Sequence, residues 1–140
     1  MVKFITLDSS VIVCSLRKEE EKYEDCLKLV KAVGDGKYIA IEPYLVLVEV
    51  VAAIRRRTDS EELAEKVKNA LLSGMFNFFD LIHERALESC EISKNTGLKG
   101  MDSIVVQISK EFNSTLVTLD KEIKEKGSKI VEIKMPSELV

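Results

Sequence analysis

The chain has 140 residues, of which 46% are hydrophobic and 32% are charged, and its formal net charge is -3. This length and composition predict a single domain over residues 1–140, with enough apolar side chains for a core and charges of both signs that argue against disorder. The acidic balance argues against a generally basic nucleic-acid coat, but it permits a local basic groove around an acidic centre.

Cysteine and histidine are scarce. Cys14, Cys26 and Cys90 contain no Cys-x-x-Cys pair, and their odd number argues against a disulfide framework or a zinc site. His83 is the only histidine, which removes Ser-His-Asp and Cys-His catalysis as serious candidates. The sequence has no signal-peptide pattern, and Glu49 interrupts its longest apolar stretch, so we expect a soluble cytoplasmic protein without a membrane partner.

Short apolar runs alternate with amphipathic segments along the chain. The runs predict strands at 3–7, 38–41, 76–82, 115–119 and 130–133. The amphipathic segments predict helices at 9–17, 20–33, 44–57, 60–73, 84–96, 102–112 and 121–126. Strands separated by helices indicate βαβ units, and therefore an α/β fold with a largely parallel sheet.

The segment 44–57 is the ambiguous one. Its Leu45–Val48 run resembles a strand, but fourteen residues without a turn signal favour a helix. The helix would be apolar on nearly every side, which is typical of a helix that is buried all round or that forms a subunit interface.

Two predicted strands end in an aspartate. Asp8 follows the run 4–7, and Asp120 follows the run 116–119. A strand-end Asp is by itself an ordinary turn residue. In parallel sheets, however, the working site lies beyond the carboxyl ends of the strands, where both of these carboxylates are expected.

Two further acids stand in positions that suit the same site. Glu49 is a lone carboxylate in an apolar helix. Burying its charge is costly unless it lies on a solvent-exposed face of the helix or faces a polar cavity that holds a cation. Asp102 opens a helix after Gly97 and Gly100, where capping or a first-turn role would explain it, although the same placement suits a metal ligand.

Four carboxylates without histidine or cysteine are hard oxygen donors of the kind that select Mg²⁺ or Mn²⁺. Clustered carboxylates with such ions typically serve phosphodiester hydrolysis, because the ion activates water and stabilises charge on the phosphate. This chemistry needs no histidine base and no protein nucleophile. An Asp-x-Asp phosphatase is excluded because position 10 is Ser, and a receiver-like phosphoacceptor domain would need an acidic pair where Ser9 and Ser10 stand.

Four stretches give the chain a resemblance to the PIN domain family, and within it to the VapC-type toxins of toxin–antitoxin pairs: 7–13, 43–57 with Glu49, 100–104, and 116–121. The resemblance implies a three-layer α/β/α sandwich and a metal-dependent ribonuclease that is dimeric and held inactive by a cognate antitoxin. It implies an acidic catalytic and metal site of Asp8, Glu49, Asp102 and Asp120, with Asp8 and Asp102 as the principal metal ligands. The hydroxyls of Ser10 and Thr118 match positions that support that site.

Contacts to RNA are less defined by the sequence. Arg55 and Lys121 are the candidate substrate-binding residues, although a basic helix end such as 55–57 is more often a solvated complement to the helix dipole. Two other functions stay open: a catalytically silent PIN-fold module that binds RNA or a protein partner, and a housekeeping RNA-processing nuclease.

Overall fold

The computed structural model of the protein describes residues 2–140. In chain order its elements are β1 (Lys3–Leu7), α1 (Ser9–Ser15), α2 (Tyr23–Gly34), β2 (Tyr38–Pro43), α3 (Tyr44–Thr58), α4 (Glu61–Leu71), β3 (Phe76–Phe79), α5 (His83–Thr96), α6 (Gly100–Phe112), β4 (Thr115–Val117), α7 (Lys121–Gly127), β5 (Ile133–Lys134) and the 3-10 turn η1 (Pro136–Glu138).

The strands form one five-stranded sheet in the order β3-β2-β1-β4-β5, and every pair in it is parallel. From β1 the chain moves outward to β2 and β3, and then crosses back to β4 and β5 on the other side of β1. This reversal makes the boundary between β1 and β4 a topological switch point, where ligands bind in open parallel sheets.

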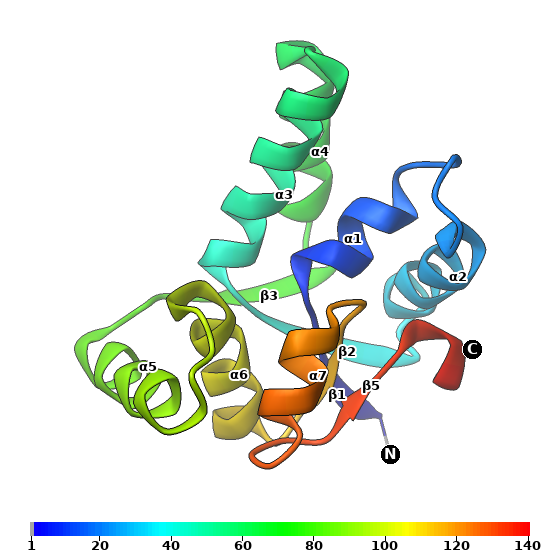
Figure 1. The fold of residues 1–140 in the computed structure, drawn as a ribbon. Coiled ribbons are helices and arrows are strands. Elements are labelled where there is room, and N and C mark those ends of the chain that lie inside the picture. The colour runs from blue at the N-terminus through cyan, green and yellow to red at the C-terminus, as the bar shows by residue number, and fades with distance from the viewer. Residues whose placement is uncertain (1) are drawn as a thin grey trace.

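Helices cover both faces of the sheet, as Figure 1 shows. Right-handed crossovers place the helices that precede β2 and β3 on one face and those that follow β3 on the other. In agreement with this rule, α1 packs against α2 and α3, whereas α6 packs against α5 and against β1 and β2. The predicted three-layer α/β/α sandwich with a largely parallel sheet is therefore confirmed.

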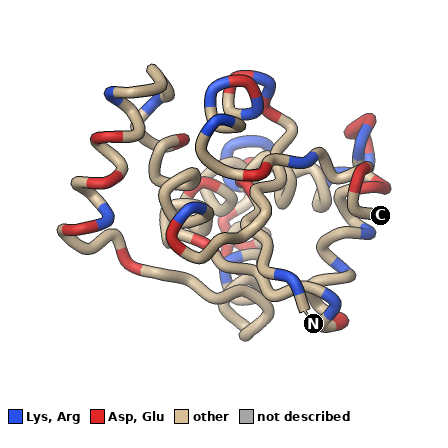
Figure 2. The backbone as a smooth tube through the Cα atoms, turned by 90° about the horizontal axis from the view of Figure 1, so that it is seen from below, with Lys and Arg blue, Asp and Glu red and all other residues tan. Residues whose placement is uncertain are grey.

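The core lies between the sheet and the helices, and it is built mainly from β-branched and leucine side chains. Ile5 and Leu7 of β1 and Leu116 of β4 are fully buried, because β1 is central and has a neighbour on both sides. Charged residues of both signs are interspersed along the rest of the backbone (Figure 2). Within residues 2–140, no helix is both long enough and apolar enough to span a membrane.

The ambiguous segment is a helix, α3, and it is buried on one side rather than all round. Val46, Val50 and Ile54 face the core, while Tyr44 and Val48 are exposed. With α4 it forms a helical hairpin that projects from the body of the molecule (Figure 1).

Several predicted boundaries were wrong. Leu81 and Ile82 lie in the loop before α5 and do not extend β3, which ends at Phe79. The last strand is Ile133–Lys134 and not 130–133, because the segment after α7 turns back onto Gly127 through the amides of Ile130 and Val131. The second helix begins at Tyr23 rather than at 20, and β4 ends at Val117 rather than at 119.

Candidate functional site

The four predicted acids line one pocket at the carboxyl edge of the sheet. The pocket has a volume of about 410 Å³ and is bordered by the start of α1, one face of α3, the first turn of α6 and the segment after β4. Its acidic lining residues include Asp8, Glu49, Asp102 and Asp120. Asp8 and Asp120 stand on either side of the switch point between β1 and β4, so the topology explains why residues so distant in sequence share one pocket.

Asp8 is the most tightly held of the four. Its amide donates to the carbonyl of Val117 at 2.9 Å, which continues the pairing of β1 with β4 beyond the last residue of β1. The hydroxyls of Ser10 and Thr118 both donate to the same carboxylate oxygen, Oδ2, at 2.8 and 2.9 Å. The other carboxylate oxygen of Asp8, Oδ1, accepts no hydrogen bond from either of these hydroxyls.

The two hydroxyls also tie the surrounding loops to Asp8. Ser10 Oγ accepts from the amide of Leu119 at 3.3 Å, and Thr118 Oγ1 accepts from the amide of Asp120 at 3.0 Å. Ser10 and Thr118, which the sequence predicts as supporting residues, thus connect the start of α1 to the segment that follows β4. One hydrogen-bonded network orients Asp8 and the backbone of Asp120 together.

Glu49 lies in the middle of α3, and its carboxyl faces Asp8 and Asp102. Desolvation raises the pKa of Glu49, the charge of Asp8 raises it further, a hydrogen bond from Ser9 opposes the shift, and Asp102 adds a smaller upward effect. A carboxylate on an otherwise apolar helix thus faces a polar pocket and not the core.

Asp102 is in the first turn of α6, but Lys99 occupies the capping position, and the side chain of Asp102 does not cap the helix. Burial raises the pKa of Asp102 to about 6, with further upward contributions from Asp8 and Asp120. Its carboxylate complements the helix dipole and remains available for a ligand in the pocket.

Asp120 has a structural role of its own. Its Oδ1 accepts hydrogen bonds from the amides of Glu122 and Ile123 at 2.8 and 3.1 Å, which caps α7. Because Oδ1 alone makes both capping bonds, Oδ2 of Asp120 is the atom that could contact a ligand in the pocket. The capping role and a ligand role are therefore compatible.

Electrostatics make this cluster costly without a cation. Burial is the largest cause of the raised pKa of Asp8, and the Asp120 charge adds to it, while Ser10, Thr118 and Ser9 lower it through hydrogen bonds. The charge of Asp8 raises the pKa values of both Glu49 and Asp102, and the charge of Asp102 raises the pKa of Glu49. Such mutual repulsion in a partly desolvated pocket favours either protonation or a bound positive charge.

The donor set suits a hydrated hard cation. Among residues 2–140, no three His, Cys, Asp or Glu side chains converge closely enough to hold one ion by themselves. Mg²⁺ usually keeps several waters and binds through one or two carboxylates, so a pocket with several separated carboxylates fits that ion better than a closed protein cage would. The residues present therefore fit Mg²⁺ or the similar Mn²⁺.

The basic residue that borders the pocket is Arg57, whereas the predicted substrate contacts were Arg55 and Lys121. The Nη1 atom of Arg57 lies 3.5 Å from Oε1 of Glu20, another lining residue. Arg55 instead lines the groove between α3 and α4 and pairs with Asp59 at 2.6 Å. Lys121 is exposed beside Asp120 and is not among the residues that border the pocket.

The helical period identifies Arg57 in retrospect. Glu49, Ala53 and Arg57 are spaced by four residues, which puts them on one face of α3, and all three line the pocket. Arg55 is half a turn away from that face. The sequence contains this information, but identifying Arg57 requires the helical positions of the three arginines at 55–57 to be compared with the position of Glu49.

Glu42 is a functional candidate that the sequence reasoning missed. It lies at the end of β2, is 0% exposed, and accepts a hydrogen bond at 2.7 Å from the amide of Leu7, the residue before Asp8. The signal was a single acid between the apolar run 38–41 and Pro43. It resembled an ordinary strand-end residue, and only the three-dimensional structure reveals its burial.

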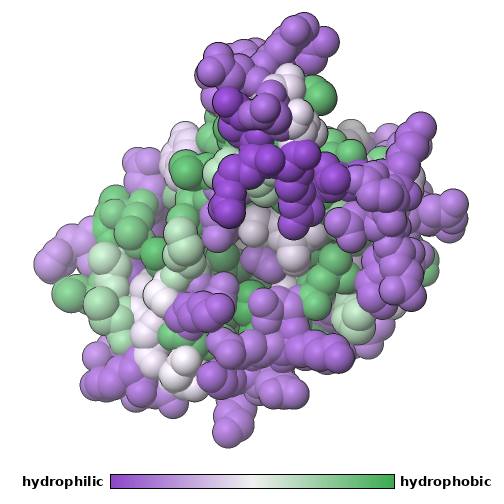
Figure 3. All heavy atoms as spheres, turned by 45° about the horizontal axis from the view of Figure 1, so that its top comes forward, coloured by the Kyte–Doolittle hydropathy of each residue, from purple (hydrophilic) through white to green (hydrophobic). Residues whose placement is uncertain are grey.

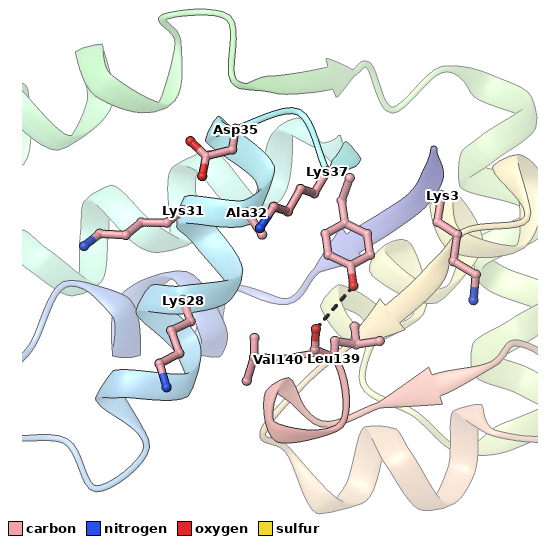
Figure 4. Close-up of a pocket in the computed structure, with 9 residues that line it drawn as sticks. Lys3, Lys28, Lys31, Ala32, Asp35, Lys37, Leu139 and Val140 are labelled. Carbon is pink, nitrogen blue, oxygen red and sulfur yellow. Dashed lines mark hydrogen bonds between the residues drawn. The ribbon is translucent and has the colours of Figure 1, made fainter. Parts of the chain in front are cut away.

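A larger hollow of about 560 Å³ lies at the opposite edge of the sheet, beside α2 and the starts of β1 and β2. Lys3, Lys28, Lys31 and Lys37 line it, but Figure 4 shows that their side chains extend in different directions. Tyr38 donates to the carbonyl of Leu139 at 3.3 Å across it. Because the ammonium groups do not converge, this hollow is less suited to a specific anion than the acidic pocket is to a cation.

A family model for the PIN domain matches residues 5–129, which is most of the chain. The chain belongs to the PIN domain family. This membership confirms the resemblance inferred from the four sequence stretches. PIN domains include nucleases, and the four acids described above lie within the matched residues. No curated protein matches the sequence.

Solved structures with a similar fold include the toxin VapC20 and chains from the FitAcB and VapBC2 structures. VapC20 of Mycobacterium tuberculosis, described as a toxin that cleaves the sarcin-ricin loop, is 13% identical and has a TM-score of 0.76 over 93% of this chain and 98% of that chain. A chain from FitAcB of Neisseria gonorrhoeae is 16% identical with a TM-score of 0.70 over 95% and 98%. A chain from VapBC2 of Rickettsia felis, solved with a promoter DNA fragment, is 18% identical with a TM-score of 0.67 over 94% and 98%.

Proposed function

We propose that this PIN domain is a metal-dependent endoribonuclease and the toxin of a type II toxin–antitoxin pair. The observation that carries the proposal is the convergence of Asp8, Glu49, Asp102 and Asp120 on one pocket at the switch point of the sheet. Membership of the PIN family and the fold shared with VapC-type toxins support the same function.

The proposed cation is Mg²⁺ or Mn²⁺, held by Asp8 and Asp102 with Glu49 and Asp120 beside them. When bound, such an ion supplies activation of water near neutral pH and stabilises the charge that develops on a phosphate. Ser10 and Thr118 hold Oδ2 of Asp8 and leave Oδ1 free of both hydroxyls. Glu49 has a raised pKa and is not one of the two principal proposed ligands, so we assign it the role of accepting a proton from a water molecule.

Arg57 is the proposed contact for an RNA phosphate. Its guanidinium borders the pocket, and Glu20 holds it there through an ion pair at 3.5 Å. A guanidinium matches the geometry of a phosphate and provides an attraction that does not depend on base identity.

A protein partner completes the proposal. An antitoxin is proposed to occupy the apolar groove between α3 and α4, whose lining includes Leu47, Val48, Val51 and Ala64. Val48 is 63% exposed there and lies beside the other apolar residues of the groove, and a contiguous exposed apolar patch is typical of a protein-binding surface. The groove shares α3 with the acidic pocket, so a segment bound in it would lie next to the face that carries Glu49 and Arg57.

The deciding experiment measures cleavage of a structured RNA and of a single-stranded RNA by purified protein freed of antitoxin. We expect cleavage with Mg²⁺ or Mn²⁺, no cleavage in EDTA, and a loss of about 100-fold or more in Asp8→Asn, because that variant removes the central ligand charge. Asp35→Asn is the matched control, since Asp35 is an exposed aspartate at the opposite edge of the sheet. An Asp8→Asn variant that cuts as well as the parent protein would refute the proposal, and so would a metal-loaded parent that cuts neither RNA.

A further inference from the structure

The hydrogen bonds between β1 and β2 change from main-chain pairs to side-chain contacts just before Asp8. Main-chain pairing between these strands runs from Lys3↔Tyr38 to Ile5↔Ala40. Beyond that point two side chains continue the link: Thr6 Oγ1 donates to the carbonyl of Ile41 at 2.7 Å, and Glu42 Oε2 accepts from the amide of Leu7 at 2.7 Å. The carboxyl of Glu42 therefore occupies the place of a main-chain acceptor at the carboxyl end of β1.

Successive amides of a strand point to opposite neighbours. The amide of Leu7 points toward β2 and meets Glu42, whereas the amide of Asp8 points toward β4 and meets the carbonyl of Val117. The backbone that carries the Asp8 side chain is therefore anchored from both sides of the sheet. Without an acceptor at Glu42, the β2 side of this anchor would be missing.

Burying a carboxyl group at position 42 costs free energy. Its side chain is fully buried, and among residues 2–140 its Oε1 has no hydrogen-bond partner. Burial raises the pKa of Glu42 well above its usual value, the Leu7 amide opposes this, and the Asp8 charge adds to it. An apolar side chain of the same size would avoid this desolvation, so the contribution of Glu42 must be sought in what Oε2 contacts.

Glu42 does not itself border the acidic pocket, and its contact is one residue away from the pocket's central acid. Such outer contacts commonly orient a metal ligand without touching the metal. We propose that Glu42 is a positioning residue for the acidic site: its Oε2 fixes the Leu7 amide and thereby the orientation of Asp8, whose side chain lines the pocket. This inference rests on the proposed metal-dependent function.

The test compares the parent protein with Glu42→Gln, which keeps an acceptor oxygen, and Glu42→Met, which keeps the length and removes the acceptor. Glu42→Asp is a second loss variant, because its carboxyl is one methylene too short to reach Leu7. Gln107→Met is the matched control, since it removes another buried side chain with an unpartnered Oε1, from α6. Residue-resolved amide exchange and the Asp8 ¹³Cγ shift are measured by NMR without metal, and Mn²⁺ affinity is measured by EPR.

We expect faster exchange of the Leu7 amide and a shifted Asp8 ¹³Cγ signal in Glu42→Met and Glu42→Asp, with about 10-fold weaker Mn²⁺ binding, and parent-like values in Glu42→Gln and Gln107→Met. Unchanged Leu7 exchange in a folded loss variant would overturn the inference, and so would an equal loss in Glu42→Gln. If Glu42→Met does not fold, the comparison of Glu42→Asp with Glu42→Gln decides it. The metal-free NMR readouts decide the inference separately from the proposed function, which fails if the parent binds Mn²⁺ but cuts no RNA.

Discussion

Thr118 Oγ1 lies 2.9 Å from Oδ2 of Asp8 and joins the end of β4 to the end of β1 across 110 residues of sequence. The same hydroxyl accepts from the amide of Asp120, so a single side chain orients two of the four acids. Thr118 is 1% exposed, which means that water cannot readily replace its hydrogen bonds.

Replacing Thr118 by valine should therefore weaken cation binding while it preserves the shape of the core. We expect the Mn²⁺ dissociation constant to rise by about 10-fold, because Asp8 loses one of its two hydroxyl donors. Isothermal titration with Mn²⁺ measures this. Thr115→Val is the control, since Thr115 begins β4, three residues before Thr118, and donates to Glu132 instead. Equal effects of the two substitutions would show that the loss is not specific to Asp8.

The metal-free protein should become less stable as the pH rises from 4 to 7. The pKa of Asp102 is raised from 3.8 to about 6, so in this range the folded state binds more protons than the unfolded state, and stability falls with pH until both forms are ionised. The raised pKa values of Asp8, Glu49 and Glu42 act in the same direction. Urea denaturation at pH 5 and pH 7.5 measures the difference.

Asp102→Asn should remove part of that dependence. We expect it to stabilise the metal-free protein at pH 7.5 by about 1–2 kcal/mol, less than the full shift would give because the side chain is partly solvated. At pH 4, where Asp102 is protonated in the folded state, the variant and the parent should have similar stability. A variant that is destabilised at pH 7.5 would contradict the assigned repulsion.

Arg57 and Arg55 form a natural pair of variants for testing the phosphate contact. Arg57→Gln should raise KM for RNA by about 10-fold with a smaller change in kcat, because a phosphate contact at the edge of the site contributes to binding in the ground state and the transition state alike. Arg55→Gln should leave KM within about twofold, since Arg55 faces the α3–α4 groove. Steady-state cleavage of a fluorescent RNA distinguishes the two, and a larger effect at Arg55 would reassign the contact.

Dimerisation is the fifth prediction. Tyr44, at the start of the segment 44–54, borders an apolar hollow with Leu81 and Ile104, and Leu81 is 54% exposed. Figure 3 shows apolar surface on the side of the molecule where α5 lies. We expect a dimer by light scattering at micromolar concentration, a monomer for Leu81→Asp, and a dimer for Leu72→Asp, which changes an exposed leucine at the end of α4. A monomeric parent protein would refute this prediction.

Sequence reasoning located the elements that position the site because the responsible signals are local. Asp8 and Asp120 stand where apolar runs stop, and Glu49 interrupts an apolar helix, so each could be identified without knowing its neighbours. Strand ends were less predictable. Leu81 and Ile82 are apolar and follow β3, but their partly exposed side chains lie in a loop where no neighbouring strand continues.

The residues that were missed depend on relationships between elements. Glu42 is distinctive only because β2 lies beside Leu7, and its complete burial follows from its position between β1 and β3. Glu20 lies before α2 and not in its first turn, and its side chain reaches Arg57 of α3. Neither contact is encoded by a spacing within one segment, so neither can be inferred from a periodic pattern.

The position of β4 beside β1 has a consequence for biosynthesis. Asp8 is synthesised before its hydroxyl donor Thr118, which follows it by 110 residues, and before the neighbouring Asp120. A nascent chain that lacks β4 has neither the strand that holds the Asp8 amide nor the hydroxyl that orients its carboxylate. The pocket can therefore assemble only after β4 has been made, which would give the proposed antitoxin time to bind α3 and α4 before the proposed activity appears.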